Sequence, residues 1–172
     1  ARTFQNIRLF GGLTVWQNLW VARNSTEDIQ SQSILRRWLG SSTTLKREIE
    51  TMLEFSDLAD KADVLASNLA FGEQRRLELA RAVAAKPQLL LLDEPAAGMN
   101  QAEVAELEQR IRSLREQGIT ILLVEHVMQL VMGVTDRIAV LNFGSKIAEG
   151  TPNDVQENAA VQEAYLGHSD QG

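Results

Sequence analysis

The spacing of hydrophobic residues in the first third of the chain predicts helices. Thr14 and Gln17 have the spacing of a capping box, which marks the start of a helix. Further helices are predicted at 33–39 and at about 45–55, and no strand pattern interrupts the region 13–67. We therefore expect a helical subdomain there. The apolar residues that follow the first cap form one broad face: Val15, Trp16, Leu19, Trp20 and Val21.

The middle of the chain alternates between helices and strands. One helix is predicted over 72–85, and a second begins at the capping residue Asn100. The segments 88–92 and 119–124 are almost entirely apolar, which is typical of strands buried on both faces. A strand, helix and strand in this order imply a parallel pair joined by a crossover. The predicted fold class is therefore α/β.

The last part of the chain predicts a hairpin and another helix. A strand at 137–141, a turn at 142–145 and a returning strand at 146–148 form the hairpin. Thr151-Pro152 then has the pattern of a helix start, because proline is tolerated at the first helical position.

Composition argues against some classes of function and excludes others. The net charge of −6 argues against a nucleic-acid surface and against a site for anionic lipid, because both need clustered Lys and Arg. The absence of cysteine excludes a disulfide framework, a thiolate metal site and a cysteine nucleophile. No apolar run approaches the roughly 18 to 20 residues that cross a bilayer. A hydrophobic content of 44% is enough for a packed core.

Two carboxylates follow the first apolar strand directly. They are Asp93 and Glu94. In open parallel sheets, ligands bind beyond the carboxyl ends of the strands. One acidic residue there can hold Mg²⁺, directly or through water, and its neighbour can activate a water molecule. The alternative is that both are solvated loop residues.

Two further positions are candidates for contact with a phosphate. Gly72 opens a predicted helix, whose free amides and positive dipole end favour an anion. His126 follows the strand at 119–124 and could hydrogen-bond a phosphate oxygen. Each position also has an ordinary interpretation. Gly72 could simply be a glycine that precedes a helix, and His126 could be a structural or solvated histidine.

In combination, these motifs resemble the ABC ATPase family. Residues 69–100 read LAFGEQRRLELARAVAAKPQLLLLDEPAAGMN, which is similar to the family's signature motif, Walker B strand and D-loop in that order. Asp93 follows Gly72 by 21 residues, which fits the family's spacing. Residues 2–5, RTFQ, are similar to the Q-loop, and His126 to the switch histidine. The resemblance covers essentially the whole chain and implies a partial P-loop NTPase core with a helical subdomain.

The resemblance implies roles for the candidate residues, with ATP and Mg²⁺ as cofactors. Asp93 would coordinate Mg²⁺ through water, and Glu94 would polarise the attacking water. His126 would contact the γ-phosphate, and Gln5 would join the metal site to the transporter interface. The signature residues would close over ATP held by a second ATP-binding subunit in a head-to-tail dimer. These signature residues are Ala70, Phe71, Gly72 and Glu73.

The resemblance also implies an organisation and a location. Residues 1–12 would be the Q-loop segment, and 13–67 the helical subdomain that contacts membrane permease subunits. Residues 68–172 would carry the signature motif, Walker B, the D-loop and the switch histidine. The subunit would be cytoplasmic and peripheral on the inner face of the membrane, and no nucleic-acid partner is expected.

Four stretches of the chain indicate a subtype. They are similar to ATP-binding subunits of branched-chain amino acid importers and span 69–82, 96–100, 125–152 and 161–167. ATPases of lipopolysaccharide export share part of this pattern. Two other readings stay open, namely a non-transport ABC ATPase such as a DNA-repair or translation factor, and a non-enzymatic interaction fragment.

Two features depart from the family pattern. Ala70 and Phe71 stand where Leu-Ser-Gly-Gly-Gln has its serine and first glycine, so backbone amides around Gly72 must do more of the phosphate binding. No G-x-x-x-x-G-K-[ST] motif occurs in the 172 residues, and we expect this Walker A loop upstream of Ala1. We therefore expect the 172-residue chain by itself to hydrolyse ATP negligibly, and to self-associate through unpaired strand edges.

Overall fold

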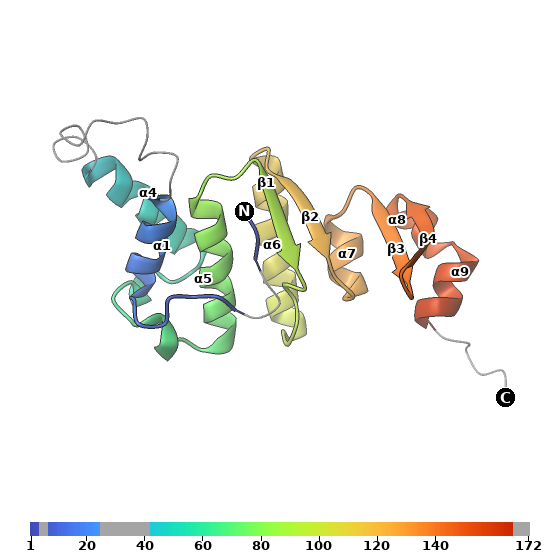
Figure 1. Ribbon diagram of the computed structural model, residues 1–172, viewed down its shortest axis with the longest axis horizontal. Helices are drawn as coiled ribbons and strands as arrows, with labels where there is room; N and C mark the ends of the chain where they lie inside the picture. The colour runs from blue at the N-terminus through green and yellow to red at the C-terminus, as the bar shows by residue number, and fades with distance from the viewer. Residues whose placement is uncertain (4–6, 25–41, 167–172) are drawn as a thin grey trace. The chain divides into compact units, whose positions relative to one another are not determined.

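The computed structural model describes residues 1–3, 7–24 and 42–166 (Figure 1). The chain divides into two compact units, Ala1–Val124 and Glu125–Gly172. The helix predicted at 33–39 lies outside the described residues. The three-segment organisation stays a prediction.

The helices of the first unit begin where the sequence predicts caps. Thr14 and Gln17 form the expected capping box, as do Asn100 and Glu103. Gly118 follows the last of these helices with a φ of +85°, the left-handed conformation that suits a glycine after a helix end. The elements are α1 (Val15–Arg23), α4 (Ser42–Phe55), the 3₁₀ turns η1 (Ala59–Lys61) and η2 (Ala66–Asn68), α5 (Phe71–Ala84) and α6 (Gln101–Glu116).

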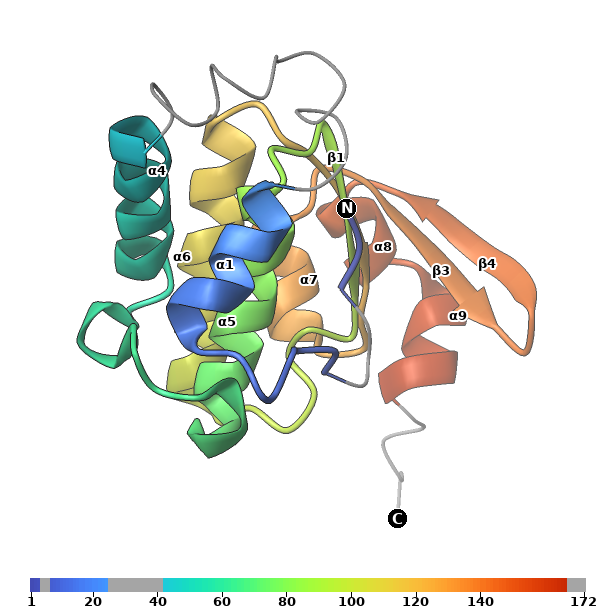
Figure 2. The ribbon, with the colours of Figure 1, turned by 60° about the vertical axis from the view of Figure 1, so that its left-hand side comes forward.

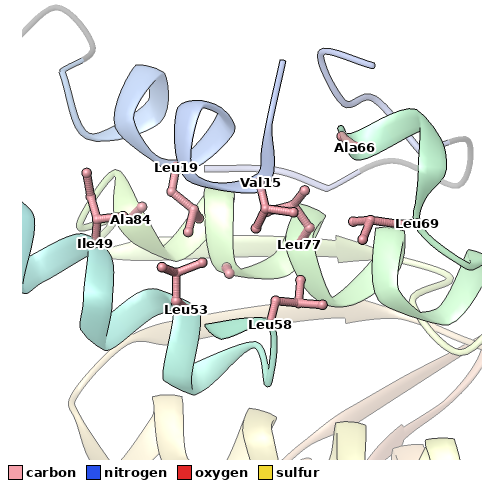
Figure 3. Close-up of a cluster of buried hydrophobic side chains, with 10 residues drawn as sticks. Val15, Leu19, Ile49, Leu53, Leu58, Ala66, Leu69, Leu77 and Ala84 are labelled. Atoms are coloured by element: carbon pink, nitrogen blue, oxygen red, sulfur yellow. The ribbon is translucent and has the colours of Figure 1, made fainter. Parts of the chain in front are cut away.

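A helical core joins α1, α4 and α5, as Figure 3 shows. Each helix contributes side chains spaced three or four residues apart, which places them on one face. Burying one such leucine or isoleucine is worth about 1.5–3 kcal/mol, so this cluster is a main source of the unit's stability. Its members are Val15, Leu19, Ile49, Leu53, Leu58, Ala66, Leu69, Leu77, Ala80 and Ala84.

The parallel strand pair predicted from the sequence is confirmed. β1 (Leu89–Asp93) pairs with β2 (Thr120–Val124) in parallel, with Asp93 opposite Val124. The N-terminal residues pair with β1 as well, because Thr3 N–H donates to the Leu91 carbonyl (2.9 Å) and Leu91 N–H to the Ala1 carbonyl (3.0 Å). Figures 1 and 2 both show the N-terminus beside β1. β1 therefore has hydrogen-bonded neighbours on both edges.

The prediction that these strands are buried on both faces is wrong. Leu90 and Leu92 are buried, whereas Leu89, Leu122 and Val124 are exposed. Successive side chains of a strand point to opposite faces, so burial on both faces needs a layer on each. Figure 2 shows α5 and α6 on the same side of β1. Among the described residues, these two helices therefore cover one face of the strand and leave the other face without them.

The second unit contains the predicted hairpin and helix start. β3 (Ile138–Asn142) pairs antiparallel with β4 (Ser145–Gly150) through a two-residue turn, Phe143 and Gly144, both with positive φ. Thr151 caps the next helix by accepting a hydrogen bond from Asp154 N–H. Val140, Val155 and Val161 form a small core. The elements are α7 (Met128–Val134), β3 (Ile138–Asn142), β4 (Ser145–Gly150), α8 (Pro152–Gln156), α9 (Ala159–Val161) and the π-helical turn η3 (Gln162–Leu166).

Candidate functional site

Asp93 lies at the carboxyl end of β1, and its carboxylate contacts Arg2. Nη2 of Arg2 donates to Oδ2 of Asp93 at 2.9 Å, and both side chains are partly exposed. Because the backbone at Ala1–Thr3 pairs with β1, the fold itself brings Arg2 to the strand end. Sequence reasoning missed this ion pair, since 91 residues separate its partners.

Glu94 has a left-handed backbone conformation, with a φ of +46°. Its N–H donates to the carbonyl of Val124 at 2.8 Å, and its own carbonyl accepts from Ala97 N–H at 3.2 Å. The chain therefore turns sharply off the strand at this residue. A non-glycine residue in this conformation costs about 1–3 kcal/mol, and such strain is concentrated at functional sites.

The signature residues open α5. Ala70 stands at the cap position without a side-chain oxygen, and its N–H donates instead to Oε2 of Glu73 at 2.9 Å. Glu73 also forms an ion pair with Lys61. The hydrogen bond from Lys61 and that from the Ala70 amide lower the pKa of Glu73. A carboxylate of this chain thus occupies part of the positive end of α5, where the sequence predicts an anion.

Residues 71 and 72, in the segment that resembles the signature motif, lie close to the loop 96–100, which resembles the D-loop, and to the helix that follows it. A Cβ atom placed on Gly72 would lie 2.9 Å from Oε1 of Glu103, the residue that completes the cap of α6. A Cβ atom on Gly98 would lie 3.4 Å from Cε1 of Phe71. The first unit therefore brings the signature motif next to the loop that follows Asp93 and Glu94.

His126 belongs to the second unit and is exposed. Its backbone N–H donates to Oε2 of Glu125 at 2.7 Å, and its Nδ1 lies 3.5 Å from the same oxygen. The contact with Glu125 orients the histidine within its own unit. Gln5, the Q-loop candidate, lies outside the described residues.

The donor groups at the strand end suit magnesium in kind. Asp93 offers carboxylate oxygens, the ligand type that Mg²⁺ takes together with several waters and substrate phosphates. Within 1–3, 7–24 and 42–166, no group of three or more His, Cys, Asp or Glu residues could hold a metal ion.

Among the described residues, five polar or charged residues are buried without being predicted from the sequence: Thr3, Asn18, Ser56, Arg75 and Glu78. Asn18 is buried in α1, and Arg75 and Glu78 are buried in α5, where Nη1 of Arg75 lies 3.4 Å from Oε2 of Glu78. The sequence does indicate that Arg75 and Glu78 can form an ion pair, because they are three residues apart on one predicted helix. Their burial was not predictable, because it depends on which face of α5 the neighbouring segments cover.

Comparison with known proteins identifies the family. A family model described as ABC transporter matches residues 1–97, more than half of the chain. The chain belongs to the ABC transporter ATP-binding family. In the intact transporter, the activity of this family is ATP hydrolysis. A second model, described as branched-chain amino acid ATP-binding cassette transporter, matches residues 145–171.

Relatives and solved structures agree with this membership. The high-affinity branched-chain amino acid transport ATP-binding protein LivG of Salmonella typhimurium is 45% identical over 98% of this chain and 68% of its own length. The lipopolysaccharide export system ATP-binding protein LptB of Haemophilus influenzae is 31% identical over 95% of this chain and 63% of its own. The structure of MJ1267, an ATP-binding cassette of an ABC transporter, has a TM-score of 0.77 at 28% identity, covering 97% of this chain and 68% of that one. The fold class is thus confirmed. No helix among the described residues is long and apolar enough to span a membrane.

Proposed function

We propose that this ABC ATP-binding subunit drives the import of branched-chain amino acids. The observation that carries the proposal is the match of residues 145–171 to the branched-chain model, because this segment lies outside the motifs that all ABC ATPases share. The higher identity to LivG than to LptB supports the same solute class over lipopolysaccharide.

In this proposal, the strand end of β1 binds the metal and activates water. The Asp93 carboxylate holds Mg²⁺ through water, and Arg2 restrains that carboxylate from one side. When bound, Mg²⁺ neutralises negative charge on the phosphate oxygens. Glu94 orients and polarises the attacking water. Its left-handed backbone and its hydrogen bond to the Val124 carbonyl fix the direction in which the side chain leaves the backbone.

The remaining residues contact the nucleotide or the transporter. His126 contacts the γ-phosphate, and Gln5 joins the metal site to the permease interface. Residues 70–73 close over ATP held by a second ATP-binding subunit in a head-to-tail dimer. Since Ala70 has no hydroxyl group, the backbone amides beside Gly72 bind the phosphate there. The helical part, 13–67, docks on the permease subunits at the cytoplasmic face of the membrane.

Replacing Glu94 tests the catalytic assignment. In the complete transporter, we expect Glu94→Gln to lower the rate of ATP hydrolysis about 10²-fold or more, since the base is removed while shape and hydrogen bonding stay similar. ATP affinity should be retained, and the two ATP-binding subunits should stay longer in the closed dimer. Glu106→Gln, an exposed change on α6, is the matched control. Near-normal turnover of Glu94→Gln would show that Glu94 is not the base.

The solute class needs a separate experiment. The subunit is reconstituted with its permease and binding protein in vesicles, and uptake of labelled leucine, isoleucine and valine is measured with and without ATP. We expect ATP-dependent uptake that is abolished by Glu94→Gln. ATP hydrolysis stimulated by lipopolysaccharide, with no amino acid uptake, would favour the export alternative.

A further inference from the structure

We propose that Phe71 is a positioning residue that couples the signature helix to the D-loop of the same subunit, and that Arg75 and Glu78 hold it there. The proposal rests on the ATPase function above, because it assigns Phe71 a role in hydrolysis. It also accounts for the aromatic ring at a position where the family's usual signature has glycine.

The first contact is between the Phe71 ring and the D-loop glycine. Gly98 has a φ of +78°, which favours glycine, and a Cβ atom there would lie 3.4 Å from Cε1 and 3.9 Å from Cζ of the ring. The ring edge therefore lies close against the D-loop backbone. Phe71 is 53% exposed, so its packing is made on this side rather than in the helical core.

The second contact holds the ring from within its own helix. The guanidinium carbon of Arg75 lies 5.4 Å from the centre of the Phe71 ring, within the range of a cation–π interaction. The two residues are four apart on α5 and thus share one face. Arg75 is only 7% exposed, so its guanidinium is largely shielded from water, which strengthens its attraction to the ring.

The third contact ties this pair to the segment that follows the Q-loop. Glu78 is 4% exposed, and its Oε2 lies 3.4 Å from Nη1 of Arg75. Its other oxygen, Oε1, accepts a hydrogen bond from Arg8 N–H at 3.2 Å. Arg8, Glu78, Arg75, Phe71 and Gly98 thus form a continuous series of contacts within one unit. A shift of the backbone at Arg8 would be transmitted toward the D-loop through the buried Glu78–Arg75 pair and the half-exposed Phe71 ring.

A double-mutant cycle separates coupling from simple proximity. In the complete transporter, ATP hydrolysis is measured for Phe71→Leu, Arg75→Lys and the double variant. We expect each single change to lower kcat about three- to tenfold at unchanged KM for ATP, the range an interaction of this class accounts for. The double variant should be no slower than the slower single one. Phe71→Tyr, which keeps the ring, should stay within about twofold of the original rate.

A matched ring in the same unit serves as the control. The Phe10 ring lies 5.2 Å from the guanidinium carbon of Arg81 and is 50% exposed, similar to Phe71. Because the charge of Arg81 interacts with that of Glu78, only the ring of this pair is varied. We expect Phe10→Leu to leave kcat within about twofold of the original rate. Equal losses for Phe71→Leu and Phe10→Leu would show that removing the ring of either cation–π pair has this effect, and would overturn the proposal.

The outcomes distinguish this inference from the proposed function. If the unmodified transporter does not hydrolyse ATP, the proposed function fails. If it does, but the effects of Phe71→Leu and Arg75→Lys multiply in the double variant, only the coupling fails. A raised KM at unchanged kcat would mean that Phe71 touches nucleotide, which also overturns a positioning role.

Hydrogen exchange gives a readout that does not depend on activity. Met99 N–H donates to the Ala96 carbonyl at 3.1 Å inside the D-loop. We expect faster exchange in residues 96–100 for Phe71→Leu and Arg75→Lys in the complete subunit, and no change for Phe10→Leu. Unchanged exchange in Phe71→Leu and Arg75→Lys would overturn the proposal, because the ring would then not restrain the loop.

Discussion

Asn18 is the buried residue whose replacement gives the most direct test of the fold around the Q-loop. Its side chain is 0% exposed, and its Oδ1 accepts a hydrogen bond from Phe10 N–H at 3.0 Å. Its Nδ2 donates to the carbonyls of Phe10 (3.1 Å), Leu13 (3.3 Å) and Thr14 (3.0 Å). The side-chain amide of Asn18 therefore holds the segment that leads into α1 in its conformation. We expect Asn18→Ala to destabilise the subunit.

The magnitude follows from what each backbone group loses. The three carbonyls keep a second donor, since each also accepts a backbone N–H: Phe10 O from Leu13, Leu13 O from Ala66 and Thr14 O from residue 18 itself. Losing the extra bonds costs about 0.5 kcal/mol each, and leaving the Phe10 N–H without its acceptor costs about 1–3 kcal/mol. The expected loss in the free energy of unfolding is therefore about 2.5–4.5 kcal/mol.

Urea unfolding of the complete subunit measures this loss. Asn24→Ala is the matched control, because Asn24 sits at the end of the same helix, less buried, and its side chain donates one bond, to Trp20 O at 2.9 Å. We expect the control to lose about 1 kcal/mol or less at the same dependence on urea. A loss below about 1 kcal/mol for Asn18→Ala would refute the reasoning, because the amide would then not be needed to satisfy these groups.

Three further predictions follow from the site and the core. Asp93→Asn should weaken Mg²⁺-dependent ATP binding as well as turnover, unlike Glu94→Gln; titrating nucleotide affinity against Mg²⁺ checks this, and equal behaviour of the two variants would contradict the separate roles. Leu77→Ala should cost about 2–5 kcal/mol in urea unfolding because Leu77 is fully buried in the helical core; a cost under about 1 kcal/mol would mean that the site collapses freely. Glu73→Gln should lower the free energy of unfolding by about 1 kcal/mol near neutral pH. Because the pKa of Glu73 lies below its ordinary value of 4.5, the stability it contributes is present above that value and is lost as the pH falls through the lowered pKa; a difference from the original subunit that persists in acid would contradict this.

Local chemistry in the sequence predicts several of the elements, and the motifs predict the family. The caps at Thr14 and Asn100 marked helix starts because a side-chain oxygen three residues from a free amide satisfies it without help from the rest of the fold. The crossover between the strands 89–93 and 120–124 made a parallel pair the expected topology. The order and spacing of the motifs indicated an ABC ATPase before any fold was known.

The tertiary structure alone decided which groups meet. Three pairs of neighbouring residues are far apart in the sequence, and no local pattern links the members of a pair. They are Arg2 with Asp93, Phe71 with Gly98, and Arg8 with Glu78. The tertiary structure also decides which faces of the strands are buried. A continuous apolar run can be covered on one face or on two, and the outcome depends on where the helices pack rather than on the strand itself. Local propensity thus placed the catalytic candidates at a strand end and a helix start, whereas long-range packing chose their partners and the conformation of Glu94.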